Sequence, residues 1–539
     1  MPETSSPLSA TLATDPYAGH VLARLLDFFQ STTPWPRGLW EVGSVLALEE
    51  AAECGDWLRM KVLSQASVSW YLHDLERRLG PDRGLGDTKL RKELTGLLRS
   101  KLPPDGRDRR RLVQLLPAIR RGYLSRWASS VDSACPPSPE RLARAVATYL
   151  LDSGHSPGRL NRWARELGTC SGTTLGDLLE AACGFAEQQD KTFEVLVPFL
   201  ALPGYQGLAS HLPEWLSPQR AACWFTERGI PDPPRHNGAF VYQFTVKDAP
   251  AAARAAGALV RRLDGRRSYA RSGRKRLTPV GRVWIDGHQG SLPLGSVDRG
   301  VSVLSLVNEK SMYSIRQSDR LDEALELAAP LNTGSAATAA AGGWAAIESL
   351  LFHPGDQSDV EEGRAVVADR LAAIVACSWP RAELTTLSHR HKPTEPDELT
   401  DRLGECACQA DRVKVIAEAL LADIPLALNS PNEVAAAKRM REVLRDPHRQ
   451  LGEVRTTLRG VFRRLYRQRN IVVHGGSTAA IALEPTLRTS APLIGAGLDR
   501  LVHSQLIDGL APLDLAARAE NSLALVGDPL GPEPTSLLT

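Results

Sequence analysis

The sequence predicts a mostly α protein with a small α/β segment near its middle. Apolar residues recur at helical spacing from about residue 40 to residue 188, and again from residue 320 onward. Between these regions the pattern changes, because an Ala-rich helical stretch at 249–263 lies among segments that alternate like strands, at 238–247, 280–286 and 301–307. At 539 residues, the chain is also too long for a single hydrophobic core.

We therefore expect four parts. They are an N-terminal helical domain, a linker with a small α/β domain, a C-terminal helical bundle and a flexible tail, at residues 1–202, 203–319, 320–525 and 526–539. The run Pro231-Asp232-Pro233-Pro234 marks the linker, because proline interrupts regular structure. The last dozen residues are Pro-rich and polar, which predicts a frayed end.

Composition indicates a globular protein, with 43% hydrophobic and 24% charged residues. The formal net charge of +3 does not by itself imply a nucleic-acid partner. Eight scattered cysteines suit a reducing cytoplasm better than a disulfide framework. We expect no membrane span, since no window approaches eighteen uncharged apolar residues. We expect no metal and no cofactor, because the cysteines and histidines near residues 377–408 lack the usual zinc-ligand spacing.

The stretch RQRNIVVHGG at 467–476 is the strongest candidate for function. It ends a predicted amphipathic helix that begins near Leu451. Arg469 lies on the apolar face of that helix, where a guanidinium requires an anion, a partner or an interface. Gly475 and Gly476 end the helix and leave His474 at its C-terminus, where the helix dipole favours an imidazolium.

This stretch resembles the signature of the HEPN family, an α-helical superfamily with many metal-independent ribonucleases. The family motif is an Arg followed after four to six residues by a His, often with an Asn directly after the Arg, and Arg469, Asn470 and His474 match it. The phrase RNIVVHGG and the upstream helix at 343–351 are most similar to the Apea-like branch. The resemblance covers residues 335–510. A second, looser match from Arg441 to His448 is interrupted by Pro447.

The resemblance implies an endoribonuclease that works without metal. His474 would transfer a proton, Arg469 would hold the phosphate, and Asn470 would orient either group. The RNA 2′-hydroxyl would be the nucleophile, which gives a 2′,3′-cyclic phosphate and a 5′-hydroxyl. Tyr466 and Glu348 are possible supporting residues. Glu348 either orients Arg469 or is merely an exposed helix residue.

Between Pro431 and His474 there are eleven Lys and Arg residues against four acids, an excess of seven basic residues. The arginines of this run nearest the motif are candidates for RNA binding: Arg459, Arg463, Arg464 and Arg467. A second basic stretch, at 261–276 with Tyr269, is equally compatible with a phosphate-binding loop and a solvated turn.

Partners follow from the same resemblance. The substrate would be single-stranded or looped RNA such as tRNA, and the protein would form a homodimer or a higher even oligomer, so that two motifs face each other. The expected role is that of a cytoplasmic toxin or abortive-infection effector in anti-phage defence, with a phage-derived trigger as a candidate partner. The alternative is a non-catalytic HEPN-like module that dimerises and senses RNA or protein.

Overall fold

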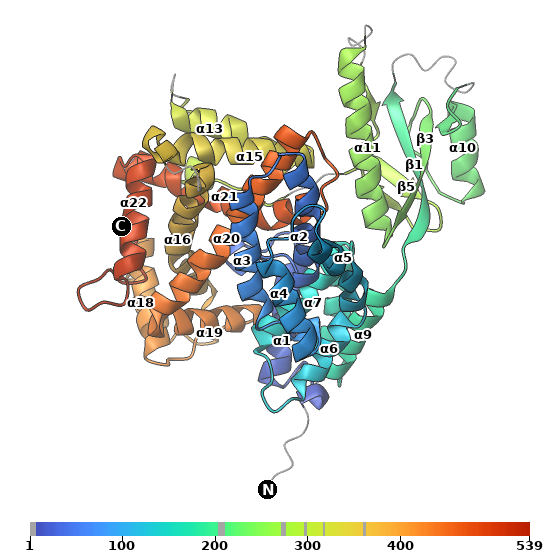
Figure 1. Ribbon diagram of the computed structural model, residues 1–539. Coiled ribbons are helices and arrows are strands. Elements are labelled where there is room, and N and C mark those ends of the chain that lie inside the picture. Colours follow the sequence, from blue (N-terminus) through green and yellow to red (C-terminus); the bar gives the residue numbers. More distant parts are fainter. Residues whose placement is uncertain are drawn as a thin grey trace. The chain divides into compact units, whose positions relative to one another are not determined.

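The computed structural model describes residues 7–202, 211–270, 276–295, 299–315, 319–358 and 363–538. The chain divides into two compact units, which are described separately. Unit 1 contains residues 1–152, 163–183 and 299–539, and unit 2 contains residues 153–162 and 184–298. The mostly helical class with a small sheet is confirmed (Figure 1).

The N-terminal part of unit 1 is made of short helices. Several begin at a side chain that caps free backbone N–H groups, such as Asp15 before α1, Ser64 before α3 and Asp87 before α4. Two later helices, α8 and α9, cross the division between the units. The nine helices described up to residue 187 are α1 (Pro16–Phe29), α2 (Ser44–Arg59), α3 (Gln65–Leu79), α4 (Thr88–Arg99), α5 (Arg107–Arg120), α6 (Tyr123–Val131), α7 (Pro139–Asp152), α8 (Pro157–Thr169) and α9 (Leu175–Glu187).

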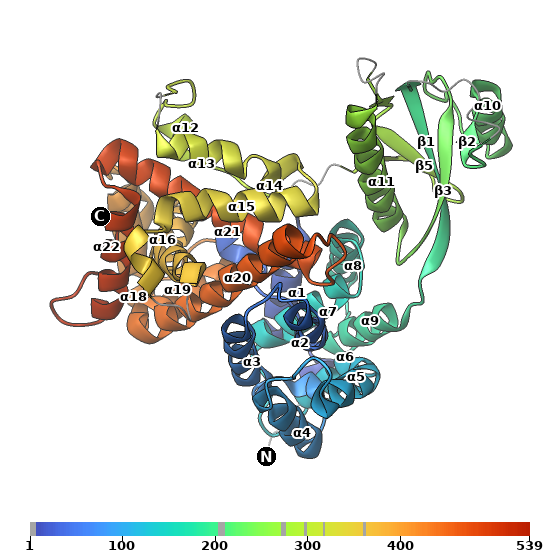
Figure 2. The ribbon, with the colours of Figure 1, turned by 45° about the horizontal axis from the view of Figure 1, so that its top comes forward.

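The C-terminal part of unit 1 is a bundle with α20 inside it. Helix α20 packs against α15, α16, α19, α21 and α22, and also against α3 from the N-terminal part (Figure 2). The helices of this part are α12 (Ser305–Asn308), α13 (Arg320–Ala328), α14 (Pro330–Thr333), α15 (Ala336–Leu351), α16 (Val366–Arg390), α17 (Glu398–Gly404), α18 (Gln409–Leu421), α19 (Pro431–Arg445), α20 (Pro447–Gly475), α21 (Leu483–His503) and α22 (Pro512–Leu525).

The two helical regions that we expected as separate domains form one compact unit. Of two polar contacts that join them, one is buried and one is partly buried. Arg37 donates to Glu383 over 2.7 Å, and Asn432 donates to Asp27 of α1 over 2.6 Å. Buried charges must be paired to be tolerated, so these contacts hold the two regions in a fixed relation.

Unit 2 is an antiparallel sheet with a helix on each face. The strand order is β2-β3-β1-β5-β6, and β4 also pairs with β1. Helix α11 and helix α10 cover opposite faces, because alternate residues of β1 pack against each: Val195 and Val197 against α11, and Leu196 against α10. The elements are β1 (Lys191–Ala201), β2 (Trp215–Leu216), α10 (Pro218–Glu227), β3 (Ala239–Val246), α11 (Ala249–Tyr269), β4 (Thr278–Pro279), β5 (Arg282–Ile285) and β6 (Ser291–Pro293).

Three expectations differ from the structure. The boundary at 202 falls too late, because β1 belongs to the sheet of unit 2. The expected strand at 301–307 is irregular and leads into the short helix α12, since its alternating pattern finds no partner strand among the described residues. The end of the chain is not a frayed tail, since Leu537 and Leu538 are buried. Part of the basic stretch at 261–276, residues 271–275, lies outside the described residues.

No helix within the described ranges combines the length and the apolar character needed to cross a membrane.

Candidate active site

Helix α20 ends as its two glycines predicted. Gly476 adopts the left-handed conformation at φ +62°, and its N–H group donates to the carbonyl of Ile471. Gly475 has a different role, because a Cβ built on it would lie only 3.1 Å from the ring of Trp57. The small residue therefore lets the end of α20 approach α2 closely. His474 is left exposed in the last turn of the helix.

Arg469, Asn470 and His474 come together at this end. The Nη1 group of Arg469 donates to Asn470 Oδ1 and to His474 Nε2, each over 3.1 Å. Since a guanidinium can only donate, the imidazole accepts this hydrogen bond at Nε2. Nε and Nη2 of Arg469 keep further N–H groups that can bind an anion.

No carboxylate in the described part of the chain pairs with Arg469, although the residue is half-buried. Burying an uncompensated cation is costly. The expectation that Arg469 requires an anion or a partner is therefore consistent with its surroundings.

Tyr466 supports the site from inside the bundle. Its ring packs on Trp344 of α15, with ring centroids 4.6 Å apart and an interplanar angle of 34°. Trp344 is fully buried. The pair fixes the face of α20 from which Asn470 and His474 project, because residues four apart on a helix share a face.

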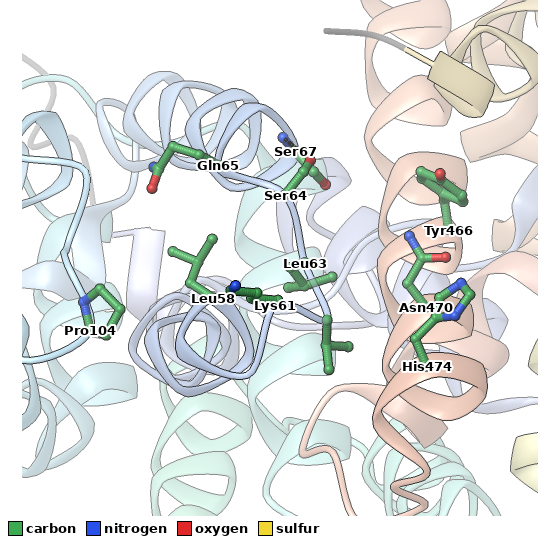
Figure 3. Close-up of a pocket in the computed structure, with 11 residues that line it drawn as sticks. Leu58, Lys61, Leu63, Ser64, Gln65, Ser67, Pro104, Tyr466, Asn470 and His474 are labelled. Carbon is green, nitrogen blue, oxygen red and sulfur yellow. Dashed lines mark hydrogen bonds between the residues drawn. The ribbon is translucent and has the colours of Figure 1, made fainter. Parts of the chain in front are cut away.

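That face lines an open cavity of about 630 Å³. Tyr466, Asn470 and His474 form one wall (Figure 3). The opposite wall comes from the N-terminal helices: it is made by the end of α2, the turn into α3 and the segment before α5, namely Leu58, Lys61, Val62, Leu63, Ser64, Gln65, Ser67 and Pro104. The motif therefore faces a hollow large enough for a nucleotide-sized ligand.

Three of the expected RNA-binding arginines are structural. Arg463 binds Asp369 of α16 through two hydrogen bonds of 3.0 and 2.7 Å, while Arg464 and Arg467 bind Glu50 of α2 over 2.9 and 3.2 Å. All three arginines are buried. Their prediction as RNA contacts was wrong for the folded chain, because distant acids that the local sequence does not reveal neutralise them. The fourth, Arg459, is half-buried over the ring of Trp70.

Glu50 is the centre of this charge cluster. Burial alone would raise the pKa of its carboxyl group, but Arg464 and Arg467 outweigh that effect and lower the pKa to about 2. The amide of Gln468 also donates to Glu50 over 3.4 Å. Glu50 therefore stays ionised and ties α2 to α20 within the two turns that precede Arg469.

Glu348 does not orient Arg469. Its carboxylate forms an ion pair with Arg364, and the side chain is only 13% exposed. Neither of the two expectations for Glu348 is met, since the residue is not an exposed helix position either. The looser match at Arg441 and His448 is also separated, because α19 ends at Arg445 and α20 begins at Pro447.

Comparison with known proteins leaves the family open. No family model, curated protein or solved structure matches this chain.

Sequence reasoning missed the wall opposite α20. Lys61 and Ser64 follow Arg59-Met60 in an ordinary helix-to-helix connection, and no motif marks them.

Among the described residues, no group of three or more His, Cys, Asp or Glu side chains is placed to hold a metal ion.

Proposed function

We propose that the chain is a metal-independent endoribonuclease with Arg469, Asn470 and His474 as its catalytic residues. The observation that carries the proposal is the double hydrogen bond from Arg469 to Asn470 and His474 at the edge of the cavity. It joins an anion-binding group, Arg469, to two residues of the cavity wall, one of which can transfer a proton.

RNA supplies its own nucleophile, so the protein needs only to transfer protons and stabilise charge. His474 Nε2 would accept the proton of the 2′-hydroxyl once Arg469 turns its donors to the phosphate. The 2′-oxygen would form a bond to phosphorus as the bond to the 5′-oxygen breaks, which leaves a 2′,3′-cyclic phosphate and a 5′-hydroxyl. Asn470 would hold Arg469 in place through its side-chain oxygen.

Of the described residues that line the cavity, one is a histidine and none is a carboxylate. The leaving 5′-oxygen needs a proton, so we propose that a second copy brings its own motif to the site in a homodimer or a higher even oligomer. Val473 and Ile481 support this interface, because they are 48% and 43% exposed in the same segment as His474. A role in anti-phage defence, with tRNA or other host RNA as substrate, belongs to the same proposal and rests on the family resemblance.

The test is cleavage of labelled tRNA and of single-stranded RNA by the full-length protein in EDTA. We expect cleavage with a cyclic-phosphate end, and loss of at least about 100-fold in His474→Ala and Arg469→Ala. His448→Ala is the matched control, because His448 is an exposed histidine at the other end of α20. Equal cleavage by wild type and His474→Ala would refute the assignment.

The single histidine also favours a second candidate, a module that binds RNA or protein without cutting. In that case wild type would leave RNA intact at every protein concentration, yet would bind it in a manner that depends on Arg469. The same set of variants therefore separates the two functions.

A further inference from the structure

The cavity wall opposite α20 carries one cation, Lys61. It lies in the turn between α2 and α3, while Tyr466, Asn470 and His474 lie across the cavity (Figure 3). The side chain of Lys61 is exposed, and no acid in the described ranges pairs with it. An unpaired ammonium on a cavity wall is a point charge available to a ligand.

The backbone of Lys61 is unusual. Its φ is +57°, in the left-handed region that favours glycine, just after the C-terminus of α2. The turn is held by hydrogen bonds from Lys61 N to Leu58 O and from Val62 N to Trp57 O, of 3.0 and 2.9 Å. A glycine would adopt this conformation without strain. Lys101 and Lys310 share this conformation, so what distinguishes Lys61 is that its side chain also lines the cavity.

The surroundings of Lys61 suit an anion attached to a flat apolar group. Helix α3 begins at Gln65 on the same wall, so its positive end adds to the charge of Lys61. Leu58 and Pro104 offer apolar surface beside these polar groups. On α20, the guanidinium of Arg469, which binds two residues of the cavity wall, has no carboxylate partner among the described residues. A nucleotide strand combines phosphates with bases in the same way.

We propose that Lys61 binds a backbone phosphate of single-stranded RNA next to the phosphate on which His474 acts. Lys61 is then a positioning residue, and the N-terminal helices contribute directly to substrate binding. This inference rests on the proposed function for its RNA ligand, but it does not require that the RNA be cut.

The experiment measures RNA binding by the full-length chain carrying His474→Ala, so that cleavage cannot interfere. A fluorescent single-stranded RNA is titrated at several salt concentrations with this parent protein and with its Lys61→Gly and Lys61→Arg variants. We expect Lys61→Gly to weaken binding about 5- to 10-fold at low salt. We also expect it to reduce the slope of log K against log salt by about 0.7, the value for one phosphate contact on a single strand. Lys61→Arg should restore both quantities.

Lys310→Gly is the matched control. Lys310 is another exposed lysine in the left-handed conformation, at φ +54°, and it does not line the cavity. Both glycine variants are expected to keep melting temperatures close to the parent, because the relief of backbone strain offsets the greater entropy of the unfolded chain. A structural effect of glycine alone would change both variants equally.

Two outcomes overturn the inference: the parent fails to bind RNA, or Lys61→Gly binds with the affinity and salt slope of the parent. The proposed function fails separately. If RNA binding depends on Lys61 but wild type never cuts RNA in EDTA, the binding role of Lys61 stands and the nuclease proposal does not. If wild type cuts RNA, and Lys61→Gly introduced into the wild-type chain cuts with unchanged KM, only the inference on Lys61 fails.

Discussion

Arg469 and His474, five residues apart on α20, are joined by a 3.1 Å hydrogen bond from Nη1 to Nε2. The same Nη1 group also binds Asn470. One planar group thus sets the position of the imidazole and keeps donors for a phosphate. An ammonium cannot reproduce this arrangement, because it is a single point charge without a second arm.

Arg469→Lys is therefore expected to lose almost as much activity as Arg469→Ala. Cleavage of RNA in EDTA should fall by at least about 100-fold, although the charge is retained. Arg445→Lys serves as the control, because Arg445 makes two hydrogen bonds to the exposed Asp423 of another segment. If Arg469→Lys keeps more than a tenth of wild-type activity, the planar fork is not needed.

Glu50→Gln should destabilise the fold strongly. It leaves Arg464 and Arg467 buried without a counter-charge, which costs about 3–5 kcal/mol. Glu49→Gln is the neighbouring control, since Glu49 pairs with the exposed Arg120 and should contribute about 1 kcal/mol or less. Urea unfolding followed by circular dichroism gives both free energies. Similar losses of unfolding free energy in the two variants would show that the buried cluster stabilises the fold no more than a surface ion pair does.

The same carboxylate predicts an acid response. The folded-state pKa of Glu50 is about 2, below the usual 4.5, so the stabilisation is complete above pH 4.5 and is lost as the pH falls from 4.5 toward 2. Melting temperatures of wild type and Glu50→Gln should converge over this interval. Parallel curves would contradict the assigned charge state.

Glu53, one turn after Glu50 on α2, should have the opposite pH dependence. Burial, partly offset by a hydrogen bond with the backbone of Ile481, raises its pKa to about 7. An acid with a raised pKa stabilises the fold below its unfolded pKa of about 4.5, and this contribution is lost as the pH rises from 4.5 to 7. The melting temperature of Glu53→Gln should therefore fall less than that of wild type between pH 5 and pH 8. The idea fails if the two pH profiles coincide.

The C-terminal segment should contribute to stability. Leu537 is 3% exposed, and its carbonyl accepts a 2.7 Å hydrogen bond from Ser522 of α22. Leu537→Ala is expected to cost about 2–3 kcal/mol in chemical denaturation. Leu530→Ala is the matched control, because Leu530 is fully exposed and should change nothing. Equal free energies of unfolding for the two variants would instead support a frayed C-terminal tail.

The sequence predicted what depends on neighbouring residues. The end of α20 follows from Gly476, and the grouping of Arg469, Asn470 and His474 follows from their spacing on one helix. In unit 2, the change in periodicity predicted the strands β3 and β5 and the helix α11, but not β1 or α10, which lie in stretches read as helical domain or linker.

Contacts between distant segments could not be predicted in this way. Arg464 looks like a surface cation, yet its partner Glu50 lies 414 residues earlier in the chain. The segment 301–307 alternates like a strand, but no neighbouring strand pairs with it within the described ranges. The sequence does not single out Lys61, because its left-handed backbone angle and its place across the cavity from α20 are visible only in the structure.

The link between Glu50 and Arg464 also sets when the protein can acquire its site during synthesis. The ribosome releases α2 before α20, so the two walls of the cavity cannot meet until both helices have left the ribosome. A premature stop before residue 464 yields a polypeptide that lacks the motif and leaves the Glu50 carboxylate without its arginines. Such products lack this buried ion pair, so we expect them to fold poorly and to be open to proteolysis.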